Sequence, residues 1–251
     1  MVAGGAAGAL GRPVARAAEP AVVAPGEADY ARLTLRGYNR RFVAQPRRIH
    51  LPGTTAEVRE AVARAVRERL PVGVRSGGHC FDDFVDNANT RALIDLERLT
   101  EVGWDQRYRA FSVAAGAELS TVYDRLGRWG VTIPGGICKG VGAGGHISGG
   151  GYGPLSRRHG LVADHLYGVE MVAVDARGEA SVVVATRDGP HRDLWWAHTG
   201  GGGGNFGVVT RFLLRSPDAD GGAPRPGGPP PPGATRARRG RGRRNRCCRR
   251  G

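Results

Sequence analysis

The sequence is poor in cysteine, and its four cysteines are not arranged for a structural role. Cys80, Cys138, Cys247 and Cys248 are spread over 251 residues. They show neither the spacing of metal ligands nor that of a disulfide framework. The sequence also lacks an apolar run long enough to cross a membrane as a helix. These absences argue against a disulfide-stapled scaffold, a zinc module and a helical membrane protein.

Lysine is almost absent, although the chain is strongly basic. Lys139 is the only lysine among 37 basic residues, and the formal net charge is +14. Such a charge at first suggests nucleic-acid binding. However, residues 217–251 hold ten arginines and two aspartates, a charge of +8, which leaves +6 for the other 216 residues. The charge therefore describes mainly the C-terminal stretch rather than the folded part.

The two ends of the chain carry little that could form a core. Residues 1–29 are rich in alanine and glycine and predict a disordered N-terminus. The remnant of an export signal is the alternative, although the charged start of such a signal is missing. The compartment stays unknown, with the cytoplasm favoured. From Pro217 no apolar residue larger than alanine occurs before Cys247, which predicts a disordered tail over residues 217–251.

Two explanations of this arginine-rich tail remain open. One is an RNA-binding segment. The other is translation out of frame, because a GC-rich coding sequence read in the wrong frame yields arginine, glycine, proline and alanine. On the second explanation the chain is truncated or frameshifted after about residue 216.

The clearest element is a helix that begins after Thr54. Thr54 and Glu57 form the pattern of a capping box. Apolar residues then recur at helical spacing: Val58, Ala61, Val62, Ala65, Val66 and Leu70. A short strand over residues 48–51 precedes this helix, and an alternating strand over residues 72–74 follows it.

Further strands and helices alternate along the rest of the chain. Apolar runs predict strands at residues 92–96, 111–116, 166–174, 180–185 and 205–214. A helix is predicted over residues 119–129 and a helical turn over residues 193–198. Leu33 and Leu35 are spaced as in a short edge strand within the polar stretch 30–42. The mixture, with hairpins, predicts an α+β fold.

A glycine-rich stretch, residues 133–153, dominates the middle of the sequence. It holds ten glycines, which argues against regular helix or strand because glycine costs conformational entropy there. Glycine also lets a backbone approach a large ligand closely. Cys138 and His146 are the side chains in this stretch with obvious chemistry.

A second, shorter glycine loop follows the strand at residues 72–74. It reads RSGGH, residues 75–79. Loop amides of this kind can bind a pyrophosphate, although the loop matches neither a dinucleotide fingerprint nor a Walker loop. A tight turn without a ligand is the alternative for this loop taken alone.

The two glycine loops and the last strand together resemble a known family. The matching segments are VRSGGH at 74–79, IDL at 94–96, PGGIC at 134–138, VGAGGH at 141–146, residues 149–156 and residues 201–209. They resemble flavin-dependent oxidases of the berberine bridge enzyme type, within the vanillyl-alcohol oxidase fold. Residues 75–87 (RSGGHCFDDFVDN) and 194–209 (LWWAHTGGGGGNFGVV) are similar to hexose oxidases of lipoglycopeptide antibiotic tailoring.

The resemblance implies a PCMH-type FAD-binding domain of two α/β subdomains over residues 30–216, with the substrate-binding domain missing. It implies FAD bonded twice, through His79 to the flavin 8α-methyl and through Cys138 to flavin C6. Taken singly, the histidine would be read as a surface residue and the cysteine as a buried apolar group. The implied cofactor-binding residues are Arg75, Ser76, Gly77, Gly78, His79, Cys80, Gly136, Cys138, Val141, Gly142, Gly145, His146, Gly150, Gly153 and Val208.

Among these, the resemblance gives particular roles to a few residues. Amides of residues 76–78 would bind the pyrophosphate, His146 the ribityl chain, and Val208 would lie against the adenine. Cys80 is interpreted as packing. Val141 sits where the family controls access of oxygen. Tyr152 would assist removal of the substrate hydroxyl proton, for which a phenol needs a charged or hydrogen-bonding neighbour; packing against the glycine loop is its alternative.

Three hypotheses for function follow. The first is an FAD-linked oxidase that converts an alcohol or sugar group of a secondary metabolite with O2, giving H2O2. The second is a catalytically inactive FAD-binding fragment. The third is an arginine-rich nucleic-acid binder. The first has a small molecule and O2 as its partners, without nucleic acid, membrane or metal, and the oligomeric state stays unknown.

Overall fold

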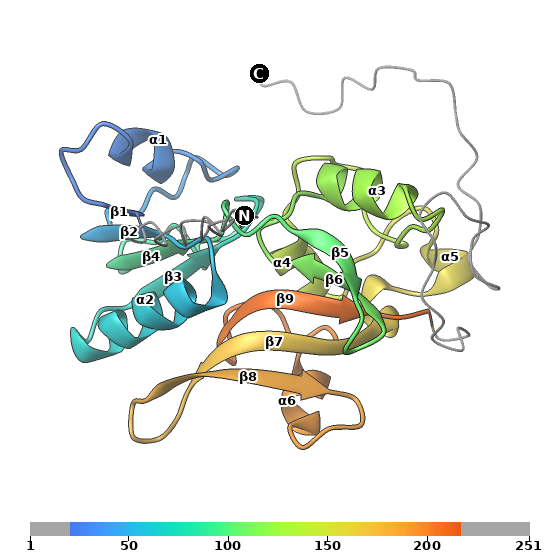
Figure 1. Cartoon of the computed structure of the whole chain (residues 1–251). Helices are drawn as coiled ribbons and strands as arrows, with labels where there is room; N and C mark the ends of the chain where they lie inside the picture. The colour runs from blue at the N-terminus through green and yellow to red at the C-terminus, as the bar shows by residue number, and fades with distance from the viewer. Residues whose placement is uncertain (1–20, 217–251) are drawn as a thin grey trace, which may run out of the picture.

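Two β-sheets form the framework of residues 21–216, the part of the chain that the computed structural model describes (Figure 1). The first sheet has the order β1-β2-β4-β3. Its strands are β1 (Ala21–Val23), β2 (Arg48–Leu51), β3 (Val72–Arg75) and β4 (Ala92–Asp95). β2 and β3 run parallel to β4, whereas β1 is antiparallel to β2. Parallel pairing requires crossovers, and α2 (Thr55–Arg67) supplies the one from β2 to β3.

The second sheet is antiparallel throughout and has the order β5-β6-β9-β7-β8. Its strands are β5 (Val102–Asp105), β6 (Ala110–Ala114), β7 (Leu166–Val174), β8 (Ala180–Thr186) and β9 (Val208–Leu214). The last strand therefore lies in the centre of this sheet, between β6 and β7. A hairpin joins β7 and β8, and the amide of Gly178 donates to the carbonyl of Asp175 in its turn.

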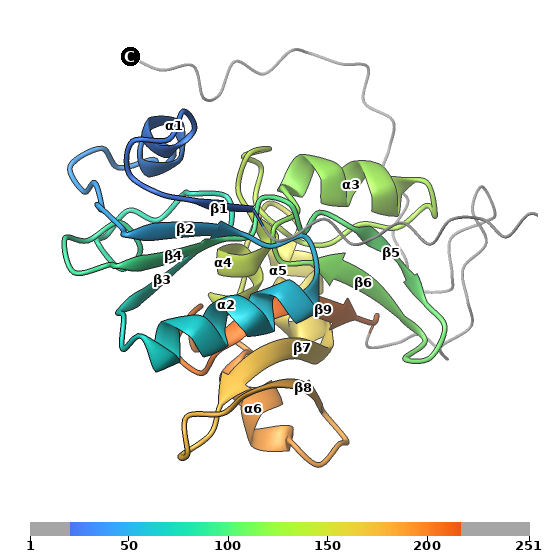
Figure 2. The same ribbon diagram turned by 60° about the vertical axis from the view of Figure 1, so that its left-hand side comes forward.

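Helix α2 lies between the two sheets and joins their cores (Figure 2). Its apolar stripe of Val58, Ala61, Val62 and Ala65 is buried. Val58, Ala61 and Val62 belong to the same apolar cluster as Ile94 of the first sheet and Val169 of the second. Thr54 caps this helix as predicted, because its hydroxyl accepts a hydrogen bond from the amide of Glu57 at 3.2 Å. The predicted capping box is only half formed, because the Glu57 carboxylate accepts from the amide of Gly53 at 2.7 Å.

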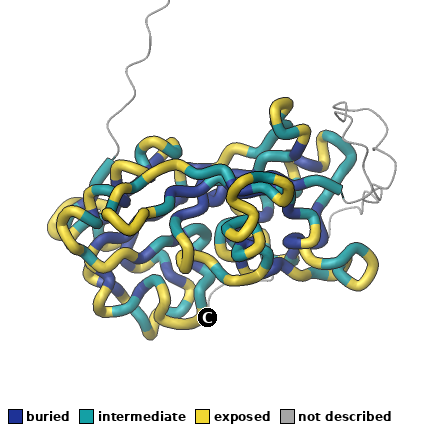
Figure 3. The backbone as a smooth tube through the Cα atoms, turned by 90° about the horizontal axis from the view of Figure 1, so that it is seen from below, coloured by how far each residue is buried: buried dark blue, intermediate teal, exposed yellow. Residues whose placement is uncertain are grey.

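Shorter helices occupy the connections. They are α1 (Tyr30–Thr34), α3 (Leu119–Gly127), α4 (Ala143–Ser148), α5 (Ser156–His159), the 3₁₀ helix η1 (Val162–His165) and α6 (Arg192–Ala197). Figure 3 shows buried residues mainly toward the middle of the fold and exposed residues mainly on the outer turns. A second, smaller cluster under α1 contains Leu33, Ile49, Leu51 and Leu93.

The α+β fold class is confirmed, as are the strands and helices predicted from residue 48 to residue 214, with shifts at their ends. The last strand begins at Val208 rather than at residue 205, and α3 ends at Gly127 rather than at residue 129. The apolar patterns did not predict β5 (Val102–Asp105), an edge strand whose residues are all partly buried.

Two predictions near the N-terminus are wrong. Leu33 and Leu35 lie not in an edge strand but at the end of α1, where Leu33 is buried and Leu35 is 42 % exposed. The predicted disordered segment 1–29 contains β1, whose Val23 pairs with Ile49. Residues 21–29 thus belong to the described fold. Residues 1–20 and the predicted tail, 217–251, lie outside the described part.

The prediction that the glycine-rich stretch holds no regular helix is also wrong. Helix α4 covers Ala143–Ser148, including Gly144 and Gly145. Tertiary packing outweighs the low helix propensity here: a Cβ on Gly144 would lie 2.9 Å from the carbonyl oxygen of Ala115 and 3.0 Å from Cβ of Ser76. Only glycine fits this close approach.

Within residues 21–216, no helix is both long and apolar enough to span a membrane. The same residues contain no group of three or more histidine, cysteine, aspartate or glutamate side chains that could hold a metal ion.

Candidate functional site

The two glycine loops lie backbone against backbone. A Cβ added to Gly77 would lie 2.2 Å from the amide nitrogen of Gly142 and 2.8 Å from the carbonyl oxygen of Gly140. The Ser76 hydroxyl joins the loops as well, because it donates to the carbonyl of Ala115 at 2.6 Å and accepts from the amide of Gly144 at 3.3 Å. Segments more than sixty residues apart in the sequence therefore form one continuous wall.

Cys138 opens a turn that is fixed to the start of α3. The amide of Val141 donates to the carbonyl of Cys138 at 3.3 Å. The amides of Leu119 and Ser120 donate to the carbonyls of Val141 and Lys139, at 2.9 and 3.0 Å. The first amides of a helix have no acceptor within the helix. Here the first amides of α3 donate to carbonyls of this turn and hold it in place.

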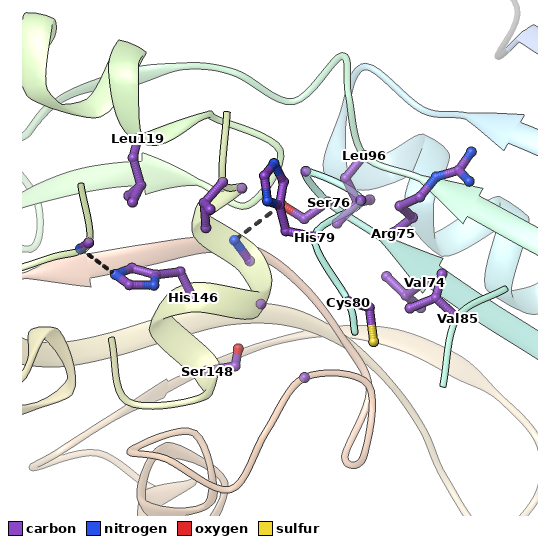
Figure 4. Close-up of a pocket in the computed structure, with 18 of the residues that line it drawn as sticks. Val74, Arg75, Ser76, His79, Cys80, Val85, Leu96, Leu119, His146 and Ser148 are labelled. Atoms are coloured by element: carbon purple, nitrogen blue, oxygen red, sulfur yellow. Dashed lines mark hydrogen bonds between the residues drawn. The ribbon is translucent and has the colours of Figure 1, made fainter. Parts of the chain in front are cut away.

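A cavity of about 900 Å³ opens between these loops and the second sheet. Small-molecule and cofactor sites typically measure about 300–1,000 Å³. Figure 4 shows its wall, with His79 and His146 on different segments and Ser148 below them. Apart from Gly150 and Val208, all of the site residues predicted from the sequence line this cavity.

Gly150 and Val208 are the two exceptions. Gly150 ends the turn after α4 with a φ of 102° and donates its amide to the carbonyl of Ile147. Val208 is 5 % exposed and belongs to the core, and the next residue, Val209, reaches the cavity instead. Side chains alternate between the two faces of a strand, so neighbouring residues of β9 face opposite ways.

The cavity also has lining residues that the sequence did not single out. Phe81, Phe84 and Ile137 reach it with exposed apolar side chains, and Gly203 and Gly204 of the five-glycine run approach it. The apolar residues carry no motif of their own. The run of five glycines, residues 200–204, was a usable sequence signal for the site. It is held there because the amide of Gly202 donates to the carbonyl of Ser148, a residue that lines the cavity.

Arg75 holds its loop from behind rather than facing the cavity with its guanidinium. The side chain is 1 % exposed and forms ion pairs with Asp86 at 3.1 Å and Asp95 at 2.8 Å. Nη2, the nitrogen that lies 2.8 Å from Asp95, also donates to the carbonyl of Leu33. In Figure 4 it points away from His79. With its donors matched, Arg75 fixes the beginning of the first glycine loop.

His79 stands at the junction of the two loops. A Cβ on Gly140 would lie 3.5 Å from Nε2 of His79, so the imidazole faces the turn that contains Cys138. Burial lowers the pKa of His79 below its ordinary value; the nearby carboxylate of Glu118 opposes this shift, and Arg36 adds to it. The imidazole is therefore favoured in its neutral, nucleophilic form.

His146 has a defined tautomer. The amide of Gly136 donates to its Nε2 at 3.1 Å, which leaves the ring proton on Nδ1. Burial lowers the pKa of His146. A neutral imidazole with a proton on Nδ1 can donate a hydrogen bond to a hydroxyl group in the cavity.

Two tyrosines differ in their surroundings. The hydroxyl of Tyr123 donates to the carbonyl of Gly136 at 2.5 Å, and burial raises its pKa to about 12. Tyr152 lines the cavity but is 77 % exposed, and its hydroxyl forms no hydrogen bond with another described residue. Tyr123 therefore supports the glycine stretch, whereas Tyr152 remains available to a molecule in the cavity.

The residues present fit FAD. The amides of Gly77, Gly78 and His79 donate to no acceptor within residues 21–216, so they can bind an anion such as a pyrophosphate. A Cβ on Gly145 would meet no atom within 4 Å and would enter the cavity, which glycine leaves open for a flat ligand. A histidine and a cysteine on the same wall add two nucleophiles.

Comparison with known proteins agrees with this geometry. The model of a family described as "FAD binding domain" matches residues 46–183. The chain belongs to this FAD-binding-domain family. The matched residues include both glycine loops, α2 and most of the second sheet. The predicted resemblance to FAD-linked oxidases of the berberine bridge enzyme type is confirmed.

Three relatives illustrate the placement of this FAD-binding domain. The aclacinomycin-N/aclacinomycin-A oxidase of Streptomyces galilaeus is 53 % identical over 195 residues, which cover 76 % of this chain and 36 % of that protein. Berberine bridge enzyme-like 12 of Arabidopsis thaliana is 37 % identical over 195 residues, 72 % of this chain and 35 % of that protein. The crystal structure of glycopeptide hexose oxidase DBV29 complexed with teicoplanin superposes with a TM-score of 0.81 at 55 % identity, covering 82 % of this chain and 42 % of that one.

The chain thus spans about a third of the length of these curated relatives. The FAD-binding part is shown by the family match, with a fold that agrees with the PCMH-type domain.

Proposed function

We propose that this chain forms the FAD site of an oxidase in which the flavin is bonded to the protein twice, through His79 and Cys138. The observation that carries the proposal is the junction of the two glycine loops. It places His79 within reach of the turn that begins at Cys138, in the wall of one cavity. We take the unit to run from β1 to the end of β9, which extends the predicted domain, residues 30–216, at its start.

Each bond would replace two hydrogens. A ring nitrogen of His79 would bond to the flavin 8α carbon in place of the imidazole N–H and one methyl C–H. The sulfur of Cys138 would bond to flavin C6 in place of the S–H and the C6–H. The two protons and two electrons lost with each bond would pass to O2, giving H2O2. The neutral state of His79 favours its step, because an imidazolium has no lone pair to offer.

Bound FAD would supply hydride acceptance, and the chain would supply binding and orientation. The free amides of residues 77–79 would hold the pyrophosphate, and Nδ1 of His146 would donate to the ribityl chain. Val141, half-buried between the cavity and the core, would control access of O2. Two bonds would fix the ring without enclosing it, so that one face stays open.

The substrate is proposed to be an alcohol or sugar group of a natural product. Support comes from relatives whose names refer to aclacinomycin and to a glycopeptide hexose oxidase complexed with teicoplanin. Exposed apolar residues around the cavity, Phe81, Phe84 and Ile137, suit a bulky molecule. Tyr152 is proposed to take the proton of the substrate hydroxyl. For this its phenol needs a charged or hydrogen-bonding neighbour, which residues 21–216 do not provide.

The test is acid precipitation of the purified chain followed by washing and intact mass measurement. The pellet should stay yellow, and the mass should rise by one FAD less two hydrogens for each bond. His79→Ala and Cys138→Ala should each keep one bond, and the double variant should release all flavin. Cys80→Ser is the matched control, because its thiol lines the same cavity beside His79 and should leave both bonds in place. A colourless wild-type pellet with the bare mass would refute double attachment.

A further inference from the structure

A short segment ahead of β2 packs across the first glycine loop. Residues 36–39 lie before the part of the chain that the family model matches, which begins at residue 46. The guanidinium of Arg36 donates to the carbonyl of Ser76 at 2.8 Å, and to both oxygens of Asp95. The side-chain amide of Asn39 donates to the carbonyl of Phe81 at 2.5 Å. The segment therefore holds the loop at both ends.

Between these two anchors, the backbone of Tyr38 is tied to the loop itself. Its amide donates to the carbonyl of Gly78 at 2.7 Å. Gly78 has a φ of 76°, and a Cβ there would lie 2.9 Å from the carbonyl oxygen of Arg36. The close approach thus depends on glycine, and it fixes where the side chain of Tyr38 leaves the backbone.

The ring of Tyr38 stacks on the imidazole of His79. The ring centroids are 5.4 Å apart and the planes meet at 20°. The ring of Phe81 meets Tyr38 edge-on at the same distance, with 86° between the planes. Tyr38 is 57 % exposed, so hydrophobic burial in a core does not explain its position. Its ring contacts are with His79 and Phe81.

We propose that Tyr38 is a positioning residue for His79: its ring packs in an offset stack beside the imidazole and holds the orientation in which a ring nitrogen meets the flavin. The proposal rests on the attachment through His79 given above. Stacked aromatic pairs attract one another beyond what their burial contributes, which favours one ring orientation of His79. The offset ring also keeps water from the side of the imidazole that it contacts.

The charges around His79 are those of Glu118, at the start of α3, and Arg36, in the segment that carries Tyr38. Neither is removed by a change at Tyr38. Loss of the ring therefore changes the solvation and the orientation of His79 while the charges stay in place.

The experiment compares Tyr38→Ala and Tyr38→Phe in the full chain. Flavin-free protein is mixed with FAD, and the growth of acid-stable flavin is followed with time. Tyr38→Ala should slow attachment by about tenfold to a hundredfold, as misplacing a reacting group by about 1 Å costs up to a hundredfold. Tyr38→Phe keeps the stack and should retain the wild-type rate. Trp196→Ala is the matched control, an exposed aromatic on α6 that does not line the cavity.

A second measurement is independent of attachment. The pKa of His79 is followed by NMR in flavin-free protein labelled at histidine nitrogen, with His79→Gln for assignment. In Tyr38→Ala the pKa of His79 should rise toward its ordinary value, because water gains access to the ring. Thermal unfolding of each variant establishes that the chain is folded.

The outcomes separate the two proposals. An unchanged pKa of His79 together with an unchanged rate in Tyr38→Ala overturns the role of Tyr38. Equal impairment in Tyr38→Phe and Tyr38→Ala also overturns it, since the hydroxyl rather than the stacked ring would then be responsible. If the wild-type chain retains no flavin in acid, covalent attachment fails, and the pKa of His79 alone decides whether Tyr38 positions it.

Discussion

Replacement of Gly77 by alanine tests the contact on which the whole site depends. The new Cβ would lie 2.2 Å from the amide nitrogen of Gly142 and 2.8 Å from both the carbonyl oxygen of Gly140 and Cα of Gly142. All three are backbone atoms, so no side chain can rotate away. The two glycine loops must separate, and the hydrogen bonds that join them through Ser76 must lengthen.

The cost follows from this geometry. Overpacking in a well-packed region costs about 1–3 kcal/mol, occasionally more, and a clash with backbone belongs at the upper end. For a domain of this size, each kcal/mol shifts Tm by about 2–4 °C. We therefore expect Gly77→Ala to lower Tm by roughly 6–12 °C, taking about 3 kcal/mol as the cost. The bound FAD should fall in parallel, because the junction forms the cavity wall.

Gly145→Ala is the matched control for this prediction. A Cβ on Gly145 would meet no atom within 4 Å, and alanine in a helix is favoured over glycine by about 0.5–1 kcal/mol. This variant should keep or raise Tm while its Cβ enters the cavity and lowers FAD content. Differential scanning calorimetry and flavin absorbance per chain provide the two readings. An unchanged Tm in Gly77→Ala would show that the loops are not in backbone contact, and would refute the site geometry.

Three further predictions concern the supports of the site. Arg75→Met removes the buried guanidinium from Asp86 and leaves Asp95 with Arg36 alone, and it should cost about 3 kcal/mol in urea unfolding. Arg177→Ala, at an exposed pair, should stay within about 0.5 kcal/mol. Tyr123→Phe leaves the carbonyl of Gly136 without its 2.5 Å donor and should cost about 1–3 kcal/mol, and a cost near zero would contradict that bond. Burial lowers the pKa of His198 in the folded chain. As pH falls below about 6.5, the unfolded chain therefore takes up a proton at His198 before the folded chain does. The free energy of unfolding should decrease from that pH down to the pKa of His198 in the folded chain. His198→Asn keeps a donor for the carbonyl of Leu194 without titrating, so its pH slope should be shallower; an equal slope would assign the effect to the other buried histidines.

Periodic elements were predictable because local spacing determines them. The stripe of α2, its cap at Thr54 and the β7–β8 hairpin satisfy rules that act within a few residues of one another. Elements stabilised only by distant partners were missed or misplaced. β5 pairs at the edge of the second sheet with β6 alone, and α1 places Leu33 into a cluster built by the first sheet.

The site shows the same division. The glycine loops, His79 and Cys138 were predictable because they form motifs, whereas the lining residues Phe81, Phe84 and Ile137 were not. The role of Arg75 as a buried support of the first glycine loop was not predictable, because its partners Asp86 and Asp95 come from other segments. Tyr38 belongs to no motif, and its stacking on His79 appears only when residues 36–39 pack across the loop.

The sequence by itself determined the alternation of strands and helices and the supply of glycines and nucleophiles, because both are written into local patterns. Only the tertiary structure decided that the two glycine loops share one wall and that α4 forms inside the glycine stretch. It also decided that Val209 rather than Val208 reaches the cavity. The physical reason is close packing: an added Cβ would lie under 3.0 Å from backbone atoms tens of residues away in the chain, so only glycine fits these positions.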